Sequence, residues 1–275
     1  MIAKVVPVLA VAGVLAGSGA ARAQTPAEPA PRVMAALGDS ISSGFNSCGF
    51  FVSCRSRSWS SGAHQEIGSH FTRLSALGSG LTARNFAVPG STSADLAAQV
   101  RKAVAARADY VTILIGAQDA CTRTEQQMTP VATYRQRLEQ ALDALRAGVP
   151  GVRVFLAGIP DVHRLWQLGK DKAAARGVWR LGRICPSMLA RPASTAKADR
   201  LRRERVRQRV ADFNRQAAAV CAVRSWCRTD RGAVFRYRFT LKQVSRWDYF
   251  HPNAAGQRAL AEITFGNGFT WTDPR

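Results

Sequence analysis

Two stretches that lie far apart in the sequence carry a serine, an aspartate and a histidine that could do nucleophilic chemistry together. An apolar run ends abruptly at Gly38-Asp39-Ser40, and the closing stretch "WDYFHPNAAGQ" places Asp248 three residues before His251. A serine hydroxyl is a poor nucleophile unless a base takes its proton, and a carboxylate can orient the imidazole that does so. We therefore predict Ser40 as the nucleophile, His251 as the base and Asp248 as the partner of the base.

The same residues have other uses, which we weigh against this prediction. Gly-Asp-Ser is typical of a turn, and the Asp248–His251 pair is also typical of a turn or capping cluster. His64 and His70 are competing bases, and with Glu66 they form a candidate metal trio, but "HQEIGSH" lacks the H-E-x-x-H spacing. No G-x-S-x-G elbow occurs in the chain. We expect neither a metal nor an organic cofactor.

The elements that must position these residues are visible as alternating patterns. Apolar runs at 33–37, 85–88, 110–115 and 152–159 are typical of buried strands, and helical patterns cover 93–106 and 131–147. This alternation predicts an α/β fold with a mostly parallel sheet covered on both faces, in three layers. No second domain boundary is visible, so residues 33–275 are expected to form a single domain.

In such a sheet the site lies beyond the carboxyl ends of the strands. The first strand is followed by Gly38-Asp39-Ser40, the second by Pro89-Gly90-Ser91 and the third by Gly116-Ala117-Gln118-Asp119. We expect these polar groups to meet at one rim, with Asp39 and Asp119 among the residues that contact the substrate. The less regular stretch 160–196 is expected to be an insertion that walls a cleft, with His163 and Trp166 on the substrate side.

The first residues are typical of export. Residues 1–23 have an early cation, a short apolar run and an Ala21-Arg22-Ala23 cleavage pattern, which predicts a secretory signal peptide. Residues 24–32 then form a flexible arm rich in Pro and Ala. The protein is therefore expected to be secreted, extracellular or periplasmic, after cleavage near Ala23.

Export gives the six cysteines a meaning, because an oxidising compartment favours disulfides. Six cysteines allow 15 pairings, and the sequence alone does not choose among them. The short spacings favour Cys48–Cys54 and Cys221–Cys227, which leaves Cys121–Cys185. The first of these bridges would close a loop that holds Phe50 and Phe51 beside the nucleophile, either packed inward or exposed to an acyl chain or interface.

The net charge of +21 predicts attraction to anionic lipid headgroups or cell-wall polymers. The densest basic stretch, "KADRLRRERVRQRVADFNRQ", carries apolar residues at helical spacing, which indicates an amphipathic helix with a solvated basic face. This stretch lacks the aromatic residues between basic ones that are typical of proteins that bind single-stranded nucleic acid. Nucleic acid is therefore not an expected partner, and we expect a monomer.

Four blocks together resemble a known family. "ALGDSISSG", "NFAVPGSTSADL", "VTILIGAQDAC" and "WDYFHPNAAGQ" are similar, in order, to the motifs of the SGNH hydrolases, also called GDSL esterases and lipases. They cover the chain from about Val33 to Phe265. The six cysteines resemble those of the secreted actinobacterial branch, whose members carry three sequential disulfides.

The resemblance implies a fold and a set of roles. The fold would be a flavodoxin-like α/β/α sandwich with a five-stranded sheet. Ser40 would be the nucleophile, His251 the base and Asp248 its partner, and the oxyanion hole would comprise the N–H groups of Ser40 and Gly90 with the amide of Gln118. The usual motif is G-x-N-D, so Gln118 adds a methylene where the family has asparagine.

The sequence thus predicts a secreted serine esterase or lipase that works through an acyl-enzyme. A small-molecule or lipid ester is the expected substrate, with lipid or phospholipid esters slightly favoured by the aromatic residues and the basic surface. An acetyl esterase acting on carbohydrate is the first alternative. A low-activity cationic binder of lipid or cell-wall polymer is the second, because Gln118 departs from the family motif.

Overall fold

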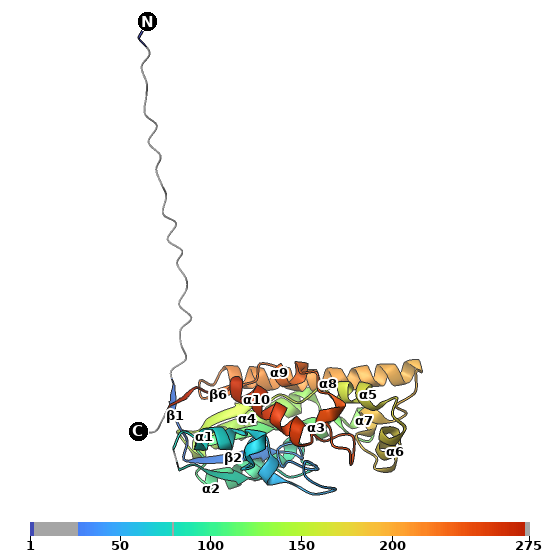
Figure 1. The fold of residues 1–275 in the computed structure, drawn as a ribbon, viewed down its shortest axis with the longest axis horizontal. Helices are drawn as coiled ribbons and strands as arrows, with labels where there is room; N and C mark the ends of the chain where they lie inside the picture. Colours follow the sequence, from blue (N-terminus) through green and yellow to red (C-terminus); the bar gives the residue numbers. More distant parts are fainter. Residues whose placement is uncertain (3–26, 79, 273–275) are drawn as a thin grey trace.

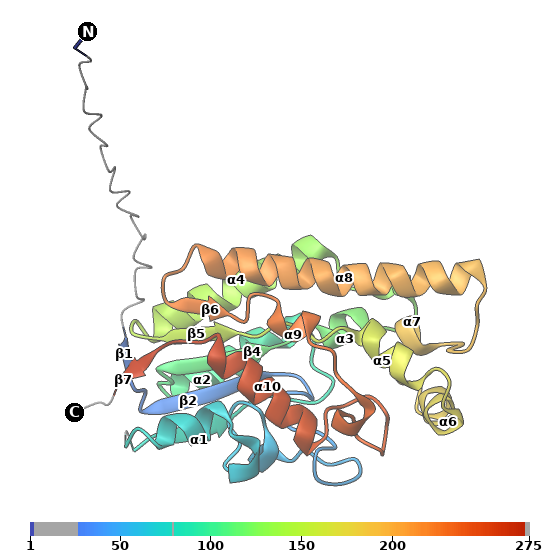
Figure 2. The same cartoon turned by 45° about the horizontal axis from the view of Figure 1, so that its top comes forward.

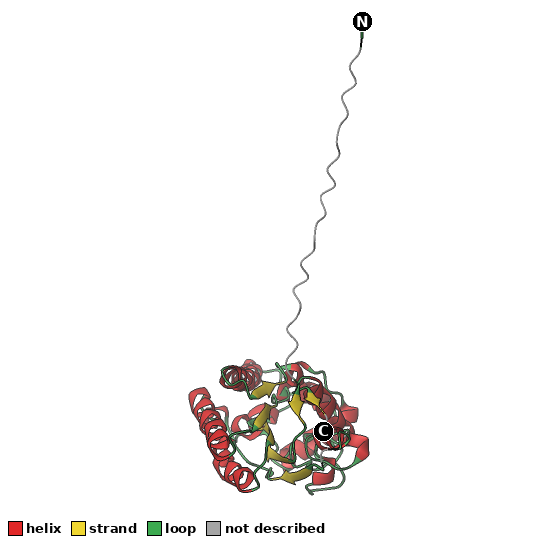
Figure 3. Ribbon diagram, turned by 90° about the vertical axis from the view of Figure 1, so that its left-hand side faces the viewer, coloured by secondary structure: helices red, strands yellow, loops and turns green. Residues whose placement is uncertain are grey.

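The computed structural model describes residues 1–2, 27–78 and 80–272. The predicted signal peptide therefore falls outside the described residues, apart from residues 1 and 2. A central sheet of five strands lies between two layers of helices (Figures 1 and 3). The predicted α/β fold is confirmed, and the sheet is entirely parallel. Its strands are β2 (Val33–Gly38), β3 (Thr82–Asn85), β4 (Tyr110–Leu114), β5 (Arg153–Leu156) and β6 (Cys227–Thr229).

The order of these strands, β3-β2-β4-β5-β6, is the flavodoxin-like order. After β2 the chain forms β3 on one side of β2, and it then forms β4 on the other side of β2. The point at which the strand order reverses, called the switch point, therefore lies between β2 and β4. The helices are α1 (His70–Ser75), α2 (Leu96–Ala105), α3 (Ala117–Ala120), α4 (Val131–Gly148), α5 (Val162–Gly169), α6 (Ala173–Leu181), α7 (Pro186–Leu189), α8 (Lys197–Ala222), α9 (Ala233–Arg236) and α10 (Ala254–Gly266).

Side chains that alternate along the central strands build one core on each face of the sheet. Val111 and Ile113 of β4 belong to the core beneath α2, α4 and α8, whereas Tyr110 and Leu114 belong to the core beneath α1 and α10. Figure 2 shows α4 and α8 on one side of the sheet and α1 and α10 on the other. A strand covered on both faces is apolar throughout, which is why β2 and β4 were predictable.

Three strands differ from the prediction, and one of them is β5, which covers only Arg153–Leu156 of the expected run 152–159. The second strand was expected at 85–88, but β3 is Thr82–Asn85, because this edge strand alternates exposed and half-buried residues and has no apolar run. The apolar residues that follow it lie in a loop. The fifth strand, β6, is only three residues long and begins at Cys227, so no apolar pattern marked it.

The segment 24–32, expected to be a flexible arm, is held in its described part. β1 (Glu28–Pro29) pairs in parallel with β7 (Trp271–Thr272), and Arg153 forms an ion pair with Glu28. Backbone pairing therefore fixes this part of the arm against the opposite end of the chain. Between residues 27 and 272, leaving out 79, no helix combines the length and the apolar character needed to cross a bilayer.

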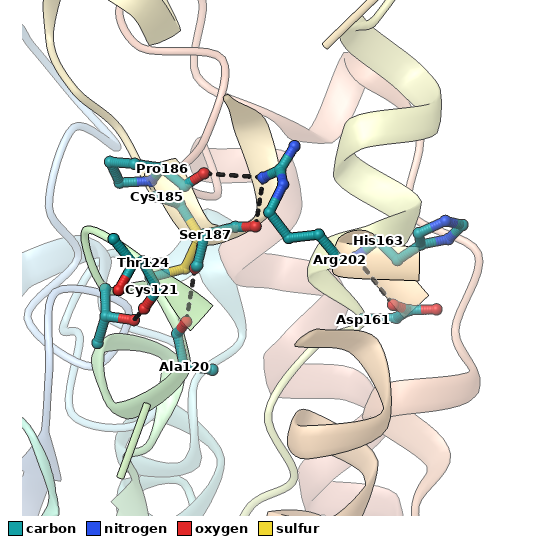
Figure 4. Close-up of a disulfide and its surroundings, with 10 residues drawn as sticks. Ala120, Cys121, Thr124, Asp161, His163, Cys185, Pro186, Ser187 and Arg202 are labelled. Carbon is teal, nitrogen blue, oxygen red and sulfur yellow. Dashed lines mark hydrogen bonds between the residues drawn. A yellow bond between two sulfur atoms is a disulfide. The ribbon is translucent and has the colours of Figure 1, made fainter. Parts of the chain in front are cut away.

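All six cysteines are paired as predicted, Cys48–Cys54, Cys121–Cys185 and Cys221–Cys227. The second disulfide joins the loop after α3 to the start of α7 (Figure 4). Beside it, the Ser187 hydroxyl donates to the Ala120 carbonyl at 2.7 Å, and the Arg202 guanidinium of α8 donates to the Pro186 carbonyl at 3.0 Å. These contacts anchor α3, which carries Gln118, to α7, and they anchor α7 to α8.

Candidate active site

Ser40, His251 and Asp248 form one chain of hydrogen bonds at the carboxyl end of β2. The Ser40 Oγ lies 2.8 Å from His251 Nε2, and His251 Nδ1 lies 2.5 Å from Asp248 Oδ2. Two residues that are 211 positions apart are thus within proton-transfer distance. The carboxylate accepts from Nδ1–H, which leaves Nε2 free to take the serine proton.

Asp248 and His251 share a closed loop that fixes their relative positions. A backbone bridge joins Val244 to Pro252 across the base of this loop. Asp248 Oδ1 accepts from the backbone N–H groups of Phe250 and His251 at 2.8 and 3.0 Å. Burial alone would raise the pKa of Asp248, but its hydrogen bonds and the charge of His251 outweigh burial and lower the pKa. The carboxylate therefore stays ionised.

The predicted insertion supports this loop from outside. Trp179 of α6 donates its indole N–H to the Tyr249 carbonyl at 3.1 Å. Because Tyr249 follows Asp248 directly, α6 buttresses the catalytic loop.

A glycine and a buried amide fix the strand end that carries Ser40. Gly38 has φ = 132°, and a Cβ at this position would lie 2.0 Å from the Leu114 carbonyl oxygen. Gln99 of α2 accepts from Gly38 N at 2.7 Å and donates to Gly38 O at 2.9 Å, and it also reaches the Ser91 hydroxyl at 3.3 Å. One side chain therefore ties the end of β2 to the loop that contains Gly90.

Asp39 was expected to contact the substrate, but its side chain is fully buried and is not open to a ligand. Its Oδ1 accepts from the Ile41 N–H at 2.9 Å, and its Oδ2 has no hydrogen-bond partner among the described residues. Burial raises the pKa of Asp39 to about 7, a shift that the Ile41 hydrogen bond and the charge of His251 partly oppose. A second carboxyl group thus sits next to Ser40, and its raised pKa brings its titration close to neutral pH.

The predicted oxyanion donors are free to bind a ligand. In the described part of the chain, no hydrogen bond engages the backbone N–H of Ser40, the backbone N–H of Gly90 or the side-chain amide of Gln118. Gly90 is exposed with φ = 84°, a left-handed conformation that glycine adopts without strain. Gln118 lies at the start of α3, directly beyond β4. Ser40 and Gln118 follow β2 and β4, the strands that flank the switch point, and Gly90 follows the neighbouring edge strand β3.

Asp119 supports a loop and is not open to the substrate. It is buried, and its two oxygens accept from the Ser93 N–H at 2.8 Å and the Ser93 hydroxyl at 2.6 Å. Arg137 of α4 adds a longer ion pair at 3.9 Å. The expectation that Asp119 binds substrate is therefore wrong, since its carboxylate is used to join α3 to the turn before α2.

An apolar cleft opens beside His251. Its wall from the insertion is one face of α5, with Val162, Leu165 and Leu168, and its other walls include Ile41, Ala117, Phe239, Val244 and Phe250. The insertion thus walls a cleft as predicted, but His163 and Trp166 do not line it. Residues at 162, 165 and 168 share a helix face that excludes 163 and 166.

His163 and Trp166 are instead used on the opposite side of α5. His163 lies half-buried in a second hollow with Arg207 and Phe235, where burial lowers its pKa. Trp166 donates to the Pro192 carbonyl at 2.8 Å, and the Arg203 guanidinium covers its ring at 4.3 Å. Figure 4 shows His163 and its capping partner Asp161 apart from the Cys121–Cys185 disulfide. Both predicted contacts with substrate are therefore corrected.

Phe50 and Phe51 point outward from the loop closed by Cys48–Cys54, with 67% and 76% of their surface exposed. Phe45 connects them to the site, since its ring lies 5.5 Å from that of Phe51 and 5.0 Å from that of His251. Of the two arrangements considered for Phe50 and Phe51, packed inward or exposed, the structure has the exposed one.

The competing histidines are placed elsewhere. His70 is buried between Tyr110 and Thr264, at 2.7 and 2.8 Å, and burial, aided by the charge of Arg73, lowers its pKa to about 3. His64 is on the surface beside Glu66. Within residues 27–78 and 80–272, no three metal-ligating side chains gather into a candidate ion site.

Sequence reasoning missed three buried amides that hold the site together. Asn46 donates to Asp248 Oδ2 at 2.5 Å, and Gln99 holds Gly38 as described above. Gln257 of α10 donates to the Ile41 carbonyl at 3.0 Å. An amide side chain carries no charge and belongs to no motif here. The one available signal was a polar residue at an otherwise apolar helix position, which applies to Gln99 and Gln257.

The sequence was then compared with known proteins. It matches the GDSL-like lipase/acylhydrolase family over residues 36–259, a span that contains every residue of the site described above. The chain belongs to this family. A search of curated protein sequences found no match.

Solved structures of other hydrolases have the same fold as this GDSL-like chain. An α/β hydrolase from the Lake Arreo metagenome is 19% identical, with a TM-score of 0.55 over 87% of this chain and 95% of that one. An extracellular lipase from Streptomyces rimosus is 18% identical, with a TM-score of 0.52 over 86% and 99%. An acetyl xylan esterase from Geobacillus stearothermophilus is 14% identical, with a TM-score of 0.51 over 86% and 94%.

Proposed function

We propose that this protein is a serine esterase or lipase that hydrolyses carboxylic esters through an acyl-enzyme on Ser40. The observation that carries the proposal is the hydrogen-bonded chain from Ser40 Oγ through His251 to Asp248, at 2.8 and 2.5 Å. Membership of a lipase and acylhydrolase family supports the same reaction class.

The reaction follows from the geometry. His251 Nε2 takes the Ser40 proton as Oγ attacks the ester carbonyl, while Asp248 stabilises the imidazolium. The N–H groups of Ser40 and Gly90 and the amide of Gln118 receive the oxyanion. His251 then protonates the departing alcohol, and water, deprotonated by His251, attacks the acyl-enzyme and releases the acid.

The substrate that we propose is an ester of an apolar acyl chain, such as a lipid or phospholipid ester. The cleft beside His251 supports this choice, because its walls are mainly aliphatic and aromatic. The cleft is small, with a volume of about 60 Å³, so its apolar walls and not its size make acetylated carbohydrate the weaker candidate. We further propose that the protein is secreted, as in the actinobacterial branch of the family; the three disulfides support an oxidising compartment.

Hydrolysis of nitrophenyl esters of increasing chain length tests the reaction and the cleft together. Ser40→Ala should abolish turnover without changing the circular dichroism spectrum. Leu165→Trp should fill the cleft and shift the preferred acyl chain to shorter lengths, whereas Trp166→Leu, on the other face of α5, is the control. Unchanged turnover in Ser40→Ala would refute the proposed nucleophile. A folded wild-type protein without turnover would support the binding alternative.

A further inference from the structure

Three exposed aromatic residues near the catalytic site lie next to one another. We name Phe50, Phe51, Val52 and Trp247 the aromatic rim. Phe50 lies 6.0 Å from Phe51 and 5.8 Å from Trp247 between ring centroids, and all four side chains are at least 40% exposed. Other exposed apolar side chains of the described residues, such as Leu181 and Val223, lie on separate elements. A contiguous patch of this kind marks an interaction site.

The backbone holds the aromatic rim outward. The loop is closed by Cys48–Cys54 and by a backbone bridge between Phe45 and Ser53. Phe51 has φ = 54°, a conformation that is costly for a bulky residue, and its N–H donates to Asn46 Oδ1 at 2.7 Å. The exposure of Phe50 and Phe51 is therefore built into the loop.

The aromatic rim is also connected to the catalytic residues. Asn46, which accepts from Phe51, donates through its Nδ2 to the catalytic carboxylate of Asp248. Phe45 fills the space between the rings of Phe51 and His251. A molecule seated on the rim thus lies next to the reacting groups.

The charge around the rim is positive. Arg246 covers the Trp247 ring at 4.7 Å, and Arg55 and Arg57 follow directly after the loop. In the two segments 45–57 and 244–252 the only carboxylate is Asp248, which is buried against His251. Apolar side chains surrounded by cations match a lipid surface with anionic headgroups.

The ring geometry decides between a lipid and a sugar polymer. The planes of neighbouring rings meet at 75° for Phe45 and Phe51, 48° for Phe50 and Phe51, and 57° for Phe50 and Trp247. These rings do not form the flat platform on which sugar rings stack, but they present edges that can enter an acyl layer.

We propose that the aromatic rim docks this protein onto the surface of an anionic lipid aggregate, and so presents esters of that surface to Ser40. The second step rests on the proposed function, whereas docking itself does not. Docking is therefore measured in a Ser40→Ala background, where hydrolysis cannot alter the vesicles.

The experiment is cosedimentation with phosphatidylglycerol vesicles and with phosphatidylcholine vesicles at low and high salt. Ser40→Ala should bind phosphatidylglycerol vesicles more tightly than phosphatidylcholine vesicles. Adding Phe50→Ser and Phe51→Ser should weaken that binding at least tenfold, and adding Arg246→Gln should reduce the preference for phosphatidylglycerol. The matched control adds Leu181→Ser and Val223→Ser, which remove side chains that are 82% and 80% exposed elsewhere, and it should bind as the parent does.

Three results would overturn the proposal. The first is equal vesicle binding with and without Phe50 and Phe51, and the second is an equal loss in the Leu181 and Val223 control. The third is that the Ser40→Ala protein does not bind vesicles but elutes as a dimer in size-exclusion chromatography, and that the dimer is lost when Phe50 and Phe51 are replaced. If vesicles bind as proposed but wild type cleaves no ester, docking stands and the proposed function fails.

Discussion

Asp39, the buried carboxyl group beside the nucleophile, makes the stability of this protein depend on pH in an unusual direction. Its pKa is about 7 in the folded protein, against 3.8 for an unperturbed aspartate. Between these values the folded protein holds a proton that the unfolded chain releases. The contribution of the protonated Asp39 carboxyl group to the free energy of unfolding is therefore complete below about pH 4. It is lost as the pH rises through 7.

The size of the effect follows from the shift. One pKa unit corresponds to 1.36 kcal/mol, so a rise of about three units costs the wild type about 4 kcal/mol at pH 8 and above. Asparagine has nearly the shape of a protonated aspartate and carries no charge at any pH. Asp39→Asn should therefore match the wild type near pH 4 and exceed it by up to about 4 kcal/mol at pH 8.

The assay is urea unfolding of both proteins at intervals between pH 4 and 9. The measured quantity is the difference between their free energies of unfolding, which should grow with pH. Asp171→Asn, on an exposed side chain paired with Lys170, is the control and should give a flat difference. A difference between Asp39→Asn and wild type that does not change with pH would refute the reasoning.

Three further predictions concern other parts of the site. Gln118→Ala should lower kcat for a soluble nitrophenyl ester by about 100-fold through loss of an oxyanion donor, and Gln118→Asn should retain more activity; equal rates in all three would exclude the amide. Asn46→Ala should lower kcat about tenfold, because Asp248 loses a donor that fixes its carboxylate toward His251; a changed KM alone would contradict this. In wild type, buried neutral His70, with a pKa of about 3, should cost about 2 kcal/mol of stability between pH 7 and 5, as the unfolded chain takes up a proton; His70→Gln should remove this slope, and an unchanged slope in urea unfolding would contradict it.

The parts of the fold that the sequence predicted are those with a local signal. β2 and β4 are apolar on both faces, so their limits were readable. β3 was displaced because an edge strand is only half apolar. β6 was missed because three residues carry no period.

The same distinction applies to the site. Ser40, Asp248 and His251 stood in recognisable blocks, and the structure brings them together. The side of α5 that faces the cleft was not readable, because His163 and Trp166 look more chemical than Leu165 but lie on the other face. Asp39 and Asp119 were placed correctly at the strand ends, but their burial depends on neighbours from distant elements.

The pairing of early and late segments sets when the protein can act during its synthesis. Ser40 and His251 are separated by 211 residues, and β1 pairs with β7. A ribosome that adds 5–20 residues per second takes roughly 10 to 40 s to cover that distance. Over this interval the growing chain carries the Ser40 hydroxyl without its proton acceptor, so the ester cleavage that we propose cannot begin in an unfinished copy.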